Sequence, residues 1–215
     1  GRAMFVLDAD DATHVLLTDE QGQIFVVDAK SANIEIVKLT TVDKTRQYSE
    51  VVCNNLEAEL LKNSSDSTDP LIHAIDAGRI MLAADSLGAS QTMIDRAVDY
   101  AKDRRQFGRA IGSFQAVKHM CAEMAADLEP CYALVWHAAH CHNHSPDESK
   151  FMACHAKAHV SEMSKSIAKK ATEVHGGMGF TDLLGLHYWF KRIGLNRQIL
   201  GSPELIREEA YRTQL

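Results

Sequence analysis

The hydrophobic residues of the chain follow two different periods, and the change between them divides the sequence into two regions. From Met4 to about Val52 they come in short runs of the kind Ile24-Phe25-Val26-Val27. Polar segments rich in Asp separate the runs, and Asp19–Gln23 is a candidate hairpin turn. This pattern predicts strands of an antiparallel sheet. So few strands cannot close a core, and residues 1–62 are therefore interpreted as the C-terminal strands of a partial β-domain.

A helical pattern begins after a polar linker, Lys62–Pro70, whose proline suits a helix start. Apolar residues then recur at spacings of three and four. Helices are predicted, to within a few residues, over 70–101, 113–143, 146–174, 183–191 and 203–212. Pro130 should kink the second of them or mark a join. Long helices with short joins predict a mainly α fold, in which an up-down four-helix bundle over 69–215 follows the partial antiparallel β-domain.

Charge and composition exclude several classes of function. The formal net charge of -6 argues against nucleic acid as the main partner, because phosphate binding needs clustered Lys and Arg. No apolar run approaches the roughly 20 residues that cross a bilayer, so no membrane span is expected. The five cysteines include no CxxC pair. Reduced thiols and a cytoplasmic or similarly reducing setting are therefore expected.

The first motif that suggests chemistry is Arg104-Arg105-Gln106-Phe107-Gly108, after the first long helix, with Gln115 a few residues further on. Arginine presents a planar fork of donors that suits phosphate, so the motif is compatible with an anion site. The charges alone do not require a ligand, since basic residues at a helix C-terminus also complement the helix dipole.

The second motif is His175-Gly176-Gly177-Met178-Gly179-Phe180, which holds three glycines in four residues. Glycine allows backbone conformations and close approaches that side chains would block. Capping of the preceding helix explains one glycine but not all three. The motif therefore favours close approach by a ligand or by a neighbouring chain.

Together the two motifs resemble the C-terminal domain of acyl-CoA dehydrogenases, and the resemblance covers essentially the whole chain. Residues 1 to about 55 are similar to the latter half of that family's middle β-domain, and 69–215 to its helical bundle. The resemblance implies FAD as the cofactor, an acyl-CoA thioester as the substrate, and α,β-desaturation as the reaction. It also implies a homo- or hetero-oligomer, a dimer or tetramer, that shares FAD sites across subunits.

The resemblance also assigns cofactor contacts. Arg104 matches the arginine that reaches the FAD diphosphate of an adjoining subunit, and Phe107 and Gln115 match residues at the adenosine end. Glu173 stands where the family usually has Gln, which places negative charge near a diphosphate and departs from the family pattern. The expected cofactor-binding set is Arg104, Gln106, Phe107, Gln115, Glu173, Gly176 and Gly177.

The catalytic base is the main departure from the family. Its members abstract an α-proton from the thioester while hydride passes from the β-carbon to the flavin. Most use a Glu followed by Gly-Thr, whereas this chain reads Leu200-Gly201-Ser202. A branched-chain and long-chain subgroup uses a Glu on the first long helix before an Arg, where this chain has Gly78 before Arg79. Neither position holds a carboxylate, so no catalytic residue is assigned.

Three interpretations of the missing base stay open. The chain is the non-catalytic partner in a heteromeric dehydrogenase, or it uses another base such as Asp182 or Glu204, or it has lost dehydrogenase activity. The stretch from Thr181 through His187–Arg192 resembles bacterial heteromeric members, which favours the first. The alternative function of a different class is a structural subunit that completes a partner's FAD site.

Histidines provide a competing signal for a metal. One helix end carries a dense group, and His155 and His159 stand four residues apart on the next helix, a spacing that zinc or a di-metal site can use. The dense group is His137, His140, Cys141, His142 and His144. Bundle metal sites usually add carboxylates from Glu-x-x-His motifs, which this sequence lacks. His142 and His144 are expected in a polar turn, no metal site is assigned, and a metal-binding bundle is the more distant alternative.

Overall fold

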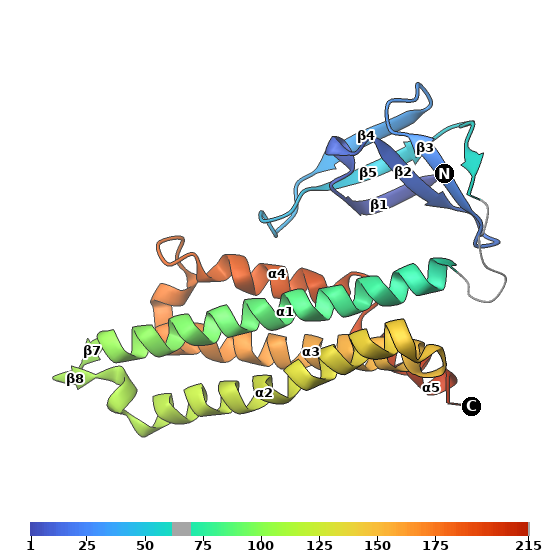
Figure 1. Ribbon diagram of the computed structural model, residues 1–215. Helices are drawn as coiled ribbons and strands as arrows, with labels where there is room; N and C mark the ends of the chain where they lie inside the picture. Colours follow the sequence, from blue (N-terminus) through green and yellow to red (C-terminus); the bar gives the residue numbers. More distant parts are fainter. Residues whose placement is uncertain (62–69, 215) are drawn as a thin grey trace. The chain divides into compact units, whose positions relative to one another are not determined.

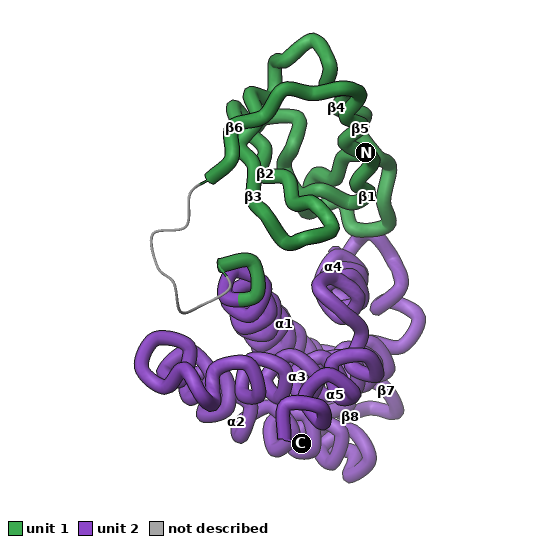
Figure 2. The backbone as a smooth tube through the Cα atoms, turned by 90° about the vertical axis from the view of Figure 1, so that its right-hand side faces the viewer, with its two compact units in different colours: residues 1–72 green, residues 73–215 purple. Residues whose placement is uncertain are grey.

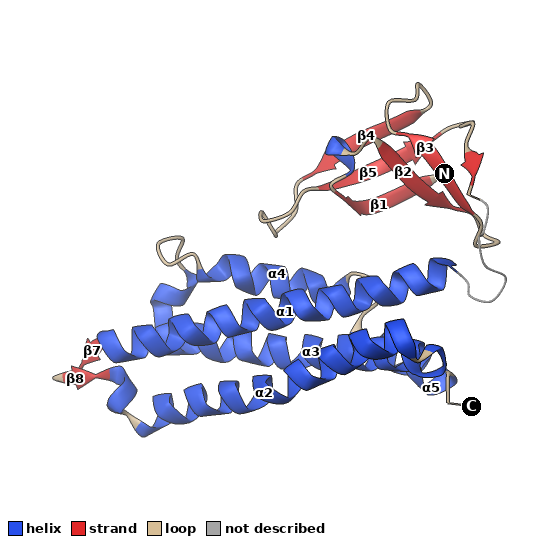
Figure 3. Ribbon diagram, in the orientation of Figure 1, coloured by secondary structure: helices blue, strands red, loops and turns tan. Residues whose placement is uncertain are grey.

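The structure, a computed structural model, describes residues 1–61 and 70–214 (Figure 1). The chain divides into two compact units, residues 1–72 and 73–215 (Figure 2). Strands make up the first unit and helices most of the second (Figure 3), which confirms the predicted fold class. The polar linker expected over 62–70 lies outside the described residues except for Pro70, which begins the first helix.

Six strands form two small antiparallel sheets in the N-terminal unit. They are β1 (Arg2–Leu7), β2 (His14–Thr18), β3 (Ile24–Asp28), β4 (Ile34–Leu39), β5 (Tyr48–Cys53) and β6 (Glu59–Leu60). One sheet has the order β1-β5-β4 and the other β2-β3-β6. The predicted hairpin turn joins β2 to β3, and the Asp19 carboxylate accepts the backbone N–H groups of Gln21 (3.0 Å) and Gln23 (2.8 Å). Such an Asx turn explains the Asp at this position.

Strand β1 lies at a sheet edge and carries exposed apolar side chains. It pairs with β5 on one side, and Met4, Phe5 and Leu7 are all exposed. Soluble sheets usually protect their edges with charge, proline or covering elements. The N-terminal unit by itself therefore presents an apolar edge strand.

Five helices form the second unit. They are α1 (Pro70–Asp103), α2 (Gln115–His144), α3 (Pro146–His175), α4 (Leu186–Gln198) and α5 (Pro203–Arg212). The first three run in alternating directions, each antiparallel to the one before it (Figure 1). Pro130 lies inside α2 without ending it, so it marks no join. The fourth helix begins later than the predicted 183–191, because Gly185, with φ of 63°, provides the left-handed residue before its first turn, and it continues beyond the predicted end to Gln198.

The turn between α2 and α3 differs from the expectation. His142 and His144 were expected in a polar turn, but both belong to the last turn of α2. Ser145 alone separates the two helices, and its backbone N–H donates to the carbonyl of Cys141 at 2.9 Å. Pro146 then begins α3, since proline at the first helical position loses no hydrogen bond.

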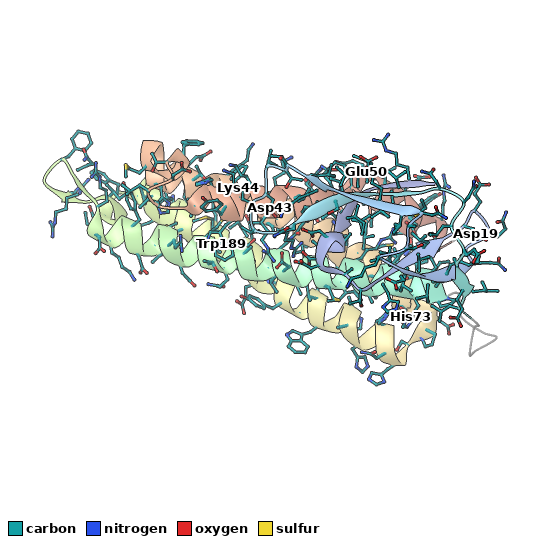
Figure 4. The ribbon with its side chains drawn as sticks, turned by 90° about the horizontal axis from the view of Figure 1, so that it is seen from above. Asp19, Asp43, Lys44, Glu50, His73 and Trp189 are labelled. Carbon is teal, nitrogen blue, oxygen red and sulfur yellow. The ribbon has the colours of Figure 1, made fainter. Side chains whose placement is uncertain are left out.

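A core of small and medium apolar side chains holds the bundle together, and it includes Met93, Met124 and Ile167, all fully buried. Trp189 of α4 packs against this core (Figure 4). A bidentate ion pair joins α4 to α1, with Arg192 donating to Asp85 at 2.9 and 2.7 Å. This pair fixes α4 along α1 and so positions the chain that follows it.

Two further findings concern the described residues as a whole. None of their helices combines the length and the apolar character that crossing a membrane requires. All five cysteines are free thiols, as the absence of paired spacings predicted.

Candidate functional site

Three segments meet at one end of the helical bundle: the end of α1, the start of α2 and the end of α3 (Figure 1). The rings of Tyr100 and His175 stack there with centroids 4.6 Å apart. The backbone N–H of Arg104 donates to the carbonyl of Tyr100 at 2.8 Å, and Gly176 directly follows His175. The two motifs found in the sequence therefore lie side by side in the fold.

A tight hairpin that the sequence did not predict connects α1 to α2. Its strands are β7 (Arg105–Gln106) and β8 (Arg109–Ala110), and Phe107 and Gly108 form the tip with φ of 52° and 77°. Positive φ at both central residues is the geometry of a type I′ turn, which favours Asn-Gly or Gly-Gly. The backbone conformation of Phe107 is strained by about 1 kcal/mol or more.

Burial does not compensate the strain at Phe107. The residue is 91% exposed, and its ring makes an edge contact with Phe114 at 6.1 Å between centroids. A solvent-facing aromatic side chain held in a conformation that suits glycine contributes little to the stability of this chain alone. Strain of this kind, kept without a local benefit, is characteristic of functional positions.

The three glycines of the second motif meet different structural requirements. Gly176 has φ of 58°, which ends α3. Gly179 packs closely, because a Cβ there would lie 2.9 Å from the carbonyl oxygen of Thr172. Gly177 has neither reason: its φ is not in the left-handed region, and a Cβ would meet nothing within 4 Å. Only Gly177 is therefore left unexplained by the chain's own packing.

Uncommitted polar side chains surround this end of the bundle. Arg104, Gln106, Gln115 and Glu173 are all exposed. Across the residues that the structure describes, none of these four side chains makes a hydrogen bond or an ion pair. Their donors and acceptors are therefore available to a polar ligand or to another chain.

The two positions at which a base was expected face each other. Gly78 lies on α1 and Leu200 follows α4, yet a Cβ built on Gly78 would lie 2.6 Å from Cδ1 of Leu200. Leu200 has φ of 55° and is followed by Gly201 at 107°, so the chain turns sharply here. The Leu200 carbonyl accepts the Nε–H of Arg79 at 3.2 Å. The leucine side chain thus occupies the space that a side chain at position 78 would need.

A charged network lies behind this pair. Arg79, only 6% exposed, donates to Asp76 at 3.3 Å and to both carboxylate oxygens of Glu209 at 3.1 and 2.7 Å. Lys150 adds a second cation 3.2 Å from Glu209. Burial raises the pKa of Asp76, against the opposing effect of Arg79, whereas the hydrogen bonds from Arg79 lower the pKa of Glu209. Asp76 is therefore committed to Arg79 and is poorly suited to act as the base that the family resemblance implies.

The other carboxylates considered as bases are also poorly placed. Asp182 is 94% exposed at its side chain and lies 3.1 Å from Nε2 of His187. Glu204 accepts a hydrogen bond from Arg197 at 2.6 Å, and hydrogen bonds led by that of Ser202 lower its pKa to about 2. A carboxylate with so low a pKa is a weak proton acceptor.

Sequence reasoning missed the residue that fixes the end of α4. The Lys157 side chain is fully buried, and its Nζ donates to the carbonyls of Asn196 (2.6 Å) and Arg197 (3.2 Å), in the last turn before Leu200. Burial lowers the pKa of Lys157 to about 8. A lysine three residues after Cys154, within the apolar stripe of α3, is the signal that could have revealed it.

Comparison with known proteins identifies the family. Residues 70–215 match the model of the acyl-CoA dehydrogenase C-terminal domain. The chain belongs to the acyl-CoA dehydrogenase family.

Individual relatives of this acyl-CoA dehydrogenase family member support the same assignment. It is 34% identical over 197 residues to the caffeyl-CoA reductase-Etf complex subunit CarC of Acetobacterium woodii, covering 84% of this chain and 51% of CarC. It is 31% identical over 211 residues to the acyl-CoA dehydrogenase IpdE2 of Mycobacterium tuberculosis, covering 94% of this chain and 59% of IpdE2. The chain therefore spans little more than half the length of these curated relatives.

Solved structures share the fold over the whole chain. One is described as the electron transferring flavoprotein of Acidaminococcus fermentans and has a TM-score of 0.89 and 25% identity, with 60% of its own chain covered. Butyryl-CoA dehydrogenase from Megasphaera elsdenii has a TM-score of 0.89 and 21% identity, with 59% of its chain covered. The second likeness, at this low identity, shows the fold alone.

Histidines elsewhere in this acyl-CoA dehydrogenase family member form separate groups. His73, near the start of α1 (Figure 4), has its ring 3.9 Å from that of His142. The rings of His155 and His159 lie nearly parallel with centroids 6.2 Å apart, beside a pocket that Arg207 also lines. The structure therefore does not gather the histidines into one site.

Proposed function

We propose that the bundle end formed by α1, α2 and α3 binds FAD. The observation that carries the proposal is Phe107, a strained and exposed aromatic residue at a hairpin tip, where a planar ring system would cover it. The open space at Gly177 and the uncommitted side chains of Arg104 and Gln115 also fit a large anionic ligand. The residues present are therefore suited to the cofactor that the family resemblance implies.

Each of these residues has a distinct task in this proposal. The Arg104 guanidinium would hold the diphosphate charge, Phe107 and Gln115 would hold the adenosine end, and Gly177 would leave room for close approach. Gln106 supports the same hairpin, and Glu173 places a negative charge near the diphosphate, which opposes binding. A bound flavin would supply the hydride acceptor for α,β-desaturation of an acyl-CoA thioester.

The chain's own residues do not supply the proton transfer at the expected positions. Gly78 and Leu200 carry no titratable group, and together they form an apolar contact. This observation favours a second candidate function, in which the chain is a non-catalytic subunit that completes the FAD site of a partner. CarC, one of its relatives, is itself named as the subunit of a complex. The match to only 51% of CarC and the exposed edge strand β1 support the partial β-domain interpretation in either case.

FAD retention tests the binding proposal. Arg104→Ala is compared with Lys102→Ala, which removes the same charge two residues earlier from an exposed lysine paired with Asp99. A hydrogen bond to a charged group is worth about 1.5–3 kcal/mol, so Arg104→Ala should raise the Kd for FAD about tenfold or more. The measurement is flavin fluorescence in titrations of the oligomer as purified. Equal Kd values for the two variants would contradict the assigned role.

Turnover separates the two candidate functions. The purified chain is assayed with FAD, a series of acyl-CoA thioesters and an artificial electron acceptor, alone and after Leu200→Glu substitution. The chain alone should show no desaturation, and Leu200→Glu should introduce a measurable rate if the pocket is otherwise complete. Desaturation by the unsubstituted chain alone would refute the non-catalytic interpretation.

A further inference from the structure

A group of metal-ligand side chains lies where α2 passes into α3, away from the proposed flavin site. His137 and Cys141 stand four residues apart in the last turns of α2, and Glu148 lies in the first turn of α3. One ligand atom from each of the three lies within 4.8 Å of the others. The single-residue turn at Ser145 brings the carboxylate of the second helix to the thiol and imidazole of the first.

The distances suit coordination by one small cation. Sγ of Cys141 lies 3.7 Å from Nε2 of His137 and 3.8 Å from Oε2 of Glu148. Zinc–sulfur and zinc–nitrogen bonds of about 2.3 and 2.0 Å in tetrahedral geometry place the two ligand atoms about 3.5 Å apart. Both separations are within a few tenths of an ångström of that spacing, so small rotations of His137 and Glu148 would complete the site.

Exposure of the three residues also suits a metal site at the surface. Cys141 is buried, whereas His137 and Glu148 are exposed, so the ion would be shielded on the thiol side and open to water on the other. A hydrogen-bonded thiol alone would explain the burial of Cys141. It would not explain the convergence of an imidazole and a carboxylate on the same sulfur atom.

We propose that His137, Cys141 and Glu148 bind a zinc ion, with water in the fourth position. The combination of thiolate, imidazole and carboxylate selects zinc over magnesium and calcium, which take oxygen ligands. On binding, the Cys141 thiol releases its proton to solvent and the sulfur lone pair forms the bond to zinc. The ion would connect the end of α2 to the start of α3, and because it binds the folded state it would raise the unfolding temperature.

Cobalt titration tests this proposal directly. The full chain is freed of metal with a chelator and titrated with Co²⁺, and Zn²⁺ is then added in competition. Saturation at one Co²⁺ per chain is expected, with a thiolate-to-cobalt charge-transfer band in the near ultraviolet that Zn²⁺ removes. Cys141→Ser should abolish the band, and Glu148→Gln and His137→Ala should each weaken binding about tenfold or more.

His140→Ala is the matched control, because it removes a histidine from the same helix end but not from the proposed site. Binding and spectrum should be unchanged in it. The proposal is overturned if no stoichiometric Co²⁺ binds, or if Cys141→Ser binds as well as the unsubstituted chain while His140→Ala does not. Thermal unfolding of each variant in chelator shows whether that variant folds. If Cys141→Ser does not fold, the cobalt affinity of the near-isosteric Glu148→Gln variant tests the proposal in its place.

Discussion

Lys157 allows a quantitative test of the way in which this bundle holds the end of α4. Its ammonium group is almost completely buried, and it donates to the carbonyls of Asn196 and Arg197 and to Oγ of Ser161 at 3.4 Å. Burial is the main cause that lowers its pKa to about 8, with the charges of Arg79 and Arg197 acting in the same direction. The folded state therefore loses this proton more readily than the unfolded chain does.

The size and sign of the effect follow from linkage. The unfolded chain holds the Lys157 proton up to its ordinary pKa of 10.5, whereas the folded chain releases it near 8. Between these values the unfolded state binds more protons, so stability rises with pH. The separation of the two pKa values corresponds to roughly 3 kcal/mol across the window. The Lys157→Met variant has no titratable group at this position, so it lacks this pH dependence of stability, whatever the substitution does to stability at neutral pH.

Urea unfolding at about pH 7.5 and about pH 10 measures the effect. Trp136 and Trp189, the two tryptophans of the chain, both lie in the helical unit and report its unfolding by fluorescence. The free energy of unfolding of the unsubstituted chain, minus that of Lys157→Met, should rise by roughly 2 kcal/mol between these two pH values, most of the full effect. Lys165→Met, an exposed lysine on the same helix, should show no such change. A constant difference for Lys157→Met would refute the burial argument.

Three further predictions concern the base positions and the hairpin. Gly78→Ala should stabilise the helical unit by about 1 kcal/mol in a Leu200→Ala background but not in the unsubstituted chain, where a methyl group of Leu200 occupies the space. If thermal unfolding gives the same effect of Gly78→Ala in both backgrounds, positions 78 and 200 do not interact. Arg79→Met should lower the free energy of unfolding by about 3–5 kcal/mol, since it leaves Asp76 buried without its cation, and adding Asp76→Asn should recover part of the loss in urea unfolding. Phe107→Asn should raise stability by about 1 kcal/mol while weakening FAD binding, and a loss of stability would contradict the strain argument.

The long helices could be predicted because their apolar positions repeat over many turns. Predicted limits for 70–101, 146–174 and 203–212 agree with the structure to within two residues. The hairpin at 105–110 was missed, since strands of two residues have no period to detect. The only sequence signal for this hairpin is Gly108 at the second position of the turn. Phe107 stands at the first position, where such a turn favours Asn or Gly.

The site could be predicted only as separate pieces. Residue type and spacing single out Arg104 and the glycines after His175, but the stacking of Tyr100 on His175 that brings them together is a tertiary contact. Glu148 shows the same limit, because its place beside Cys141 depends on the turn between two helices. Residues on different elements meet through packing that no local pattern encodes.

The contact between Gly78 and Leu200 shows which of the two expected base positions has room for a carboxylate. The two positions share one space, so a side chain at 78 requires the Leu200 side chain to move aside or to be replaced by a smaller one. Glutamate at 200 could occupy that space with Gly78 unchanged, whereas glutamate at 78 requires the end of the Leu200 side chain, 2.6 Å from the Cβ position, to move aside. Placing a carboxylate at 200 therefore needs one substitution and no rearrangement, whereas placing one at 78 also needs the Leu200 side chain to move.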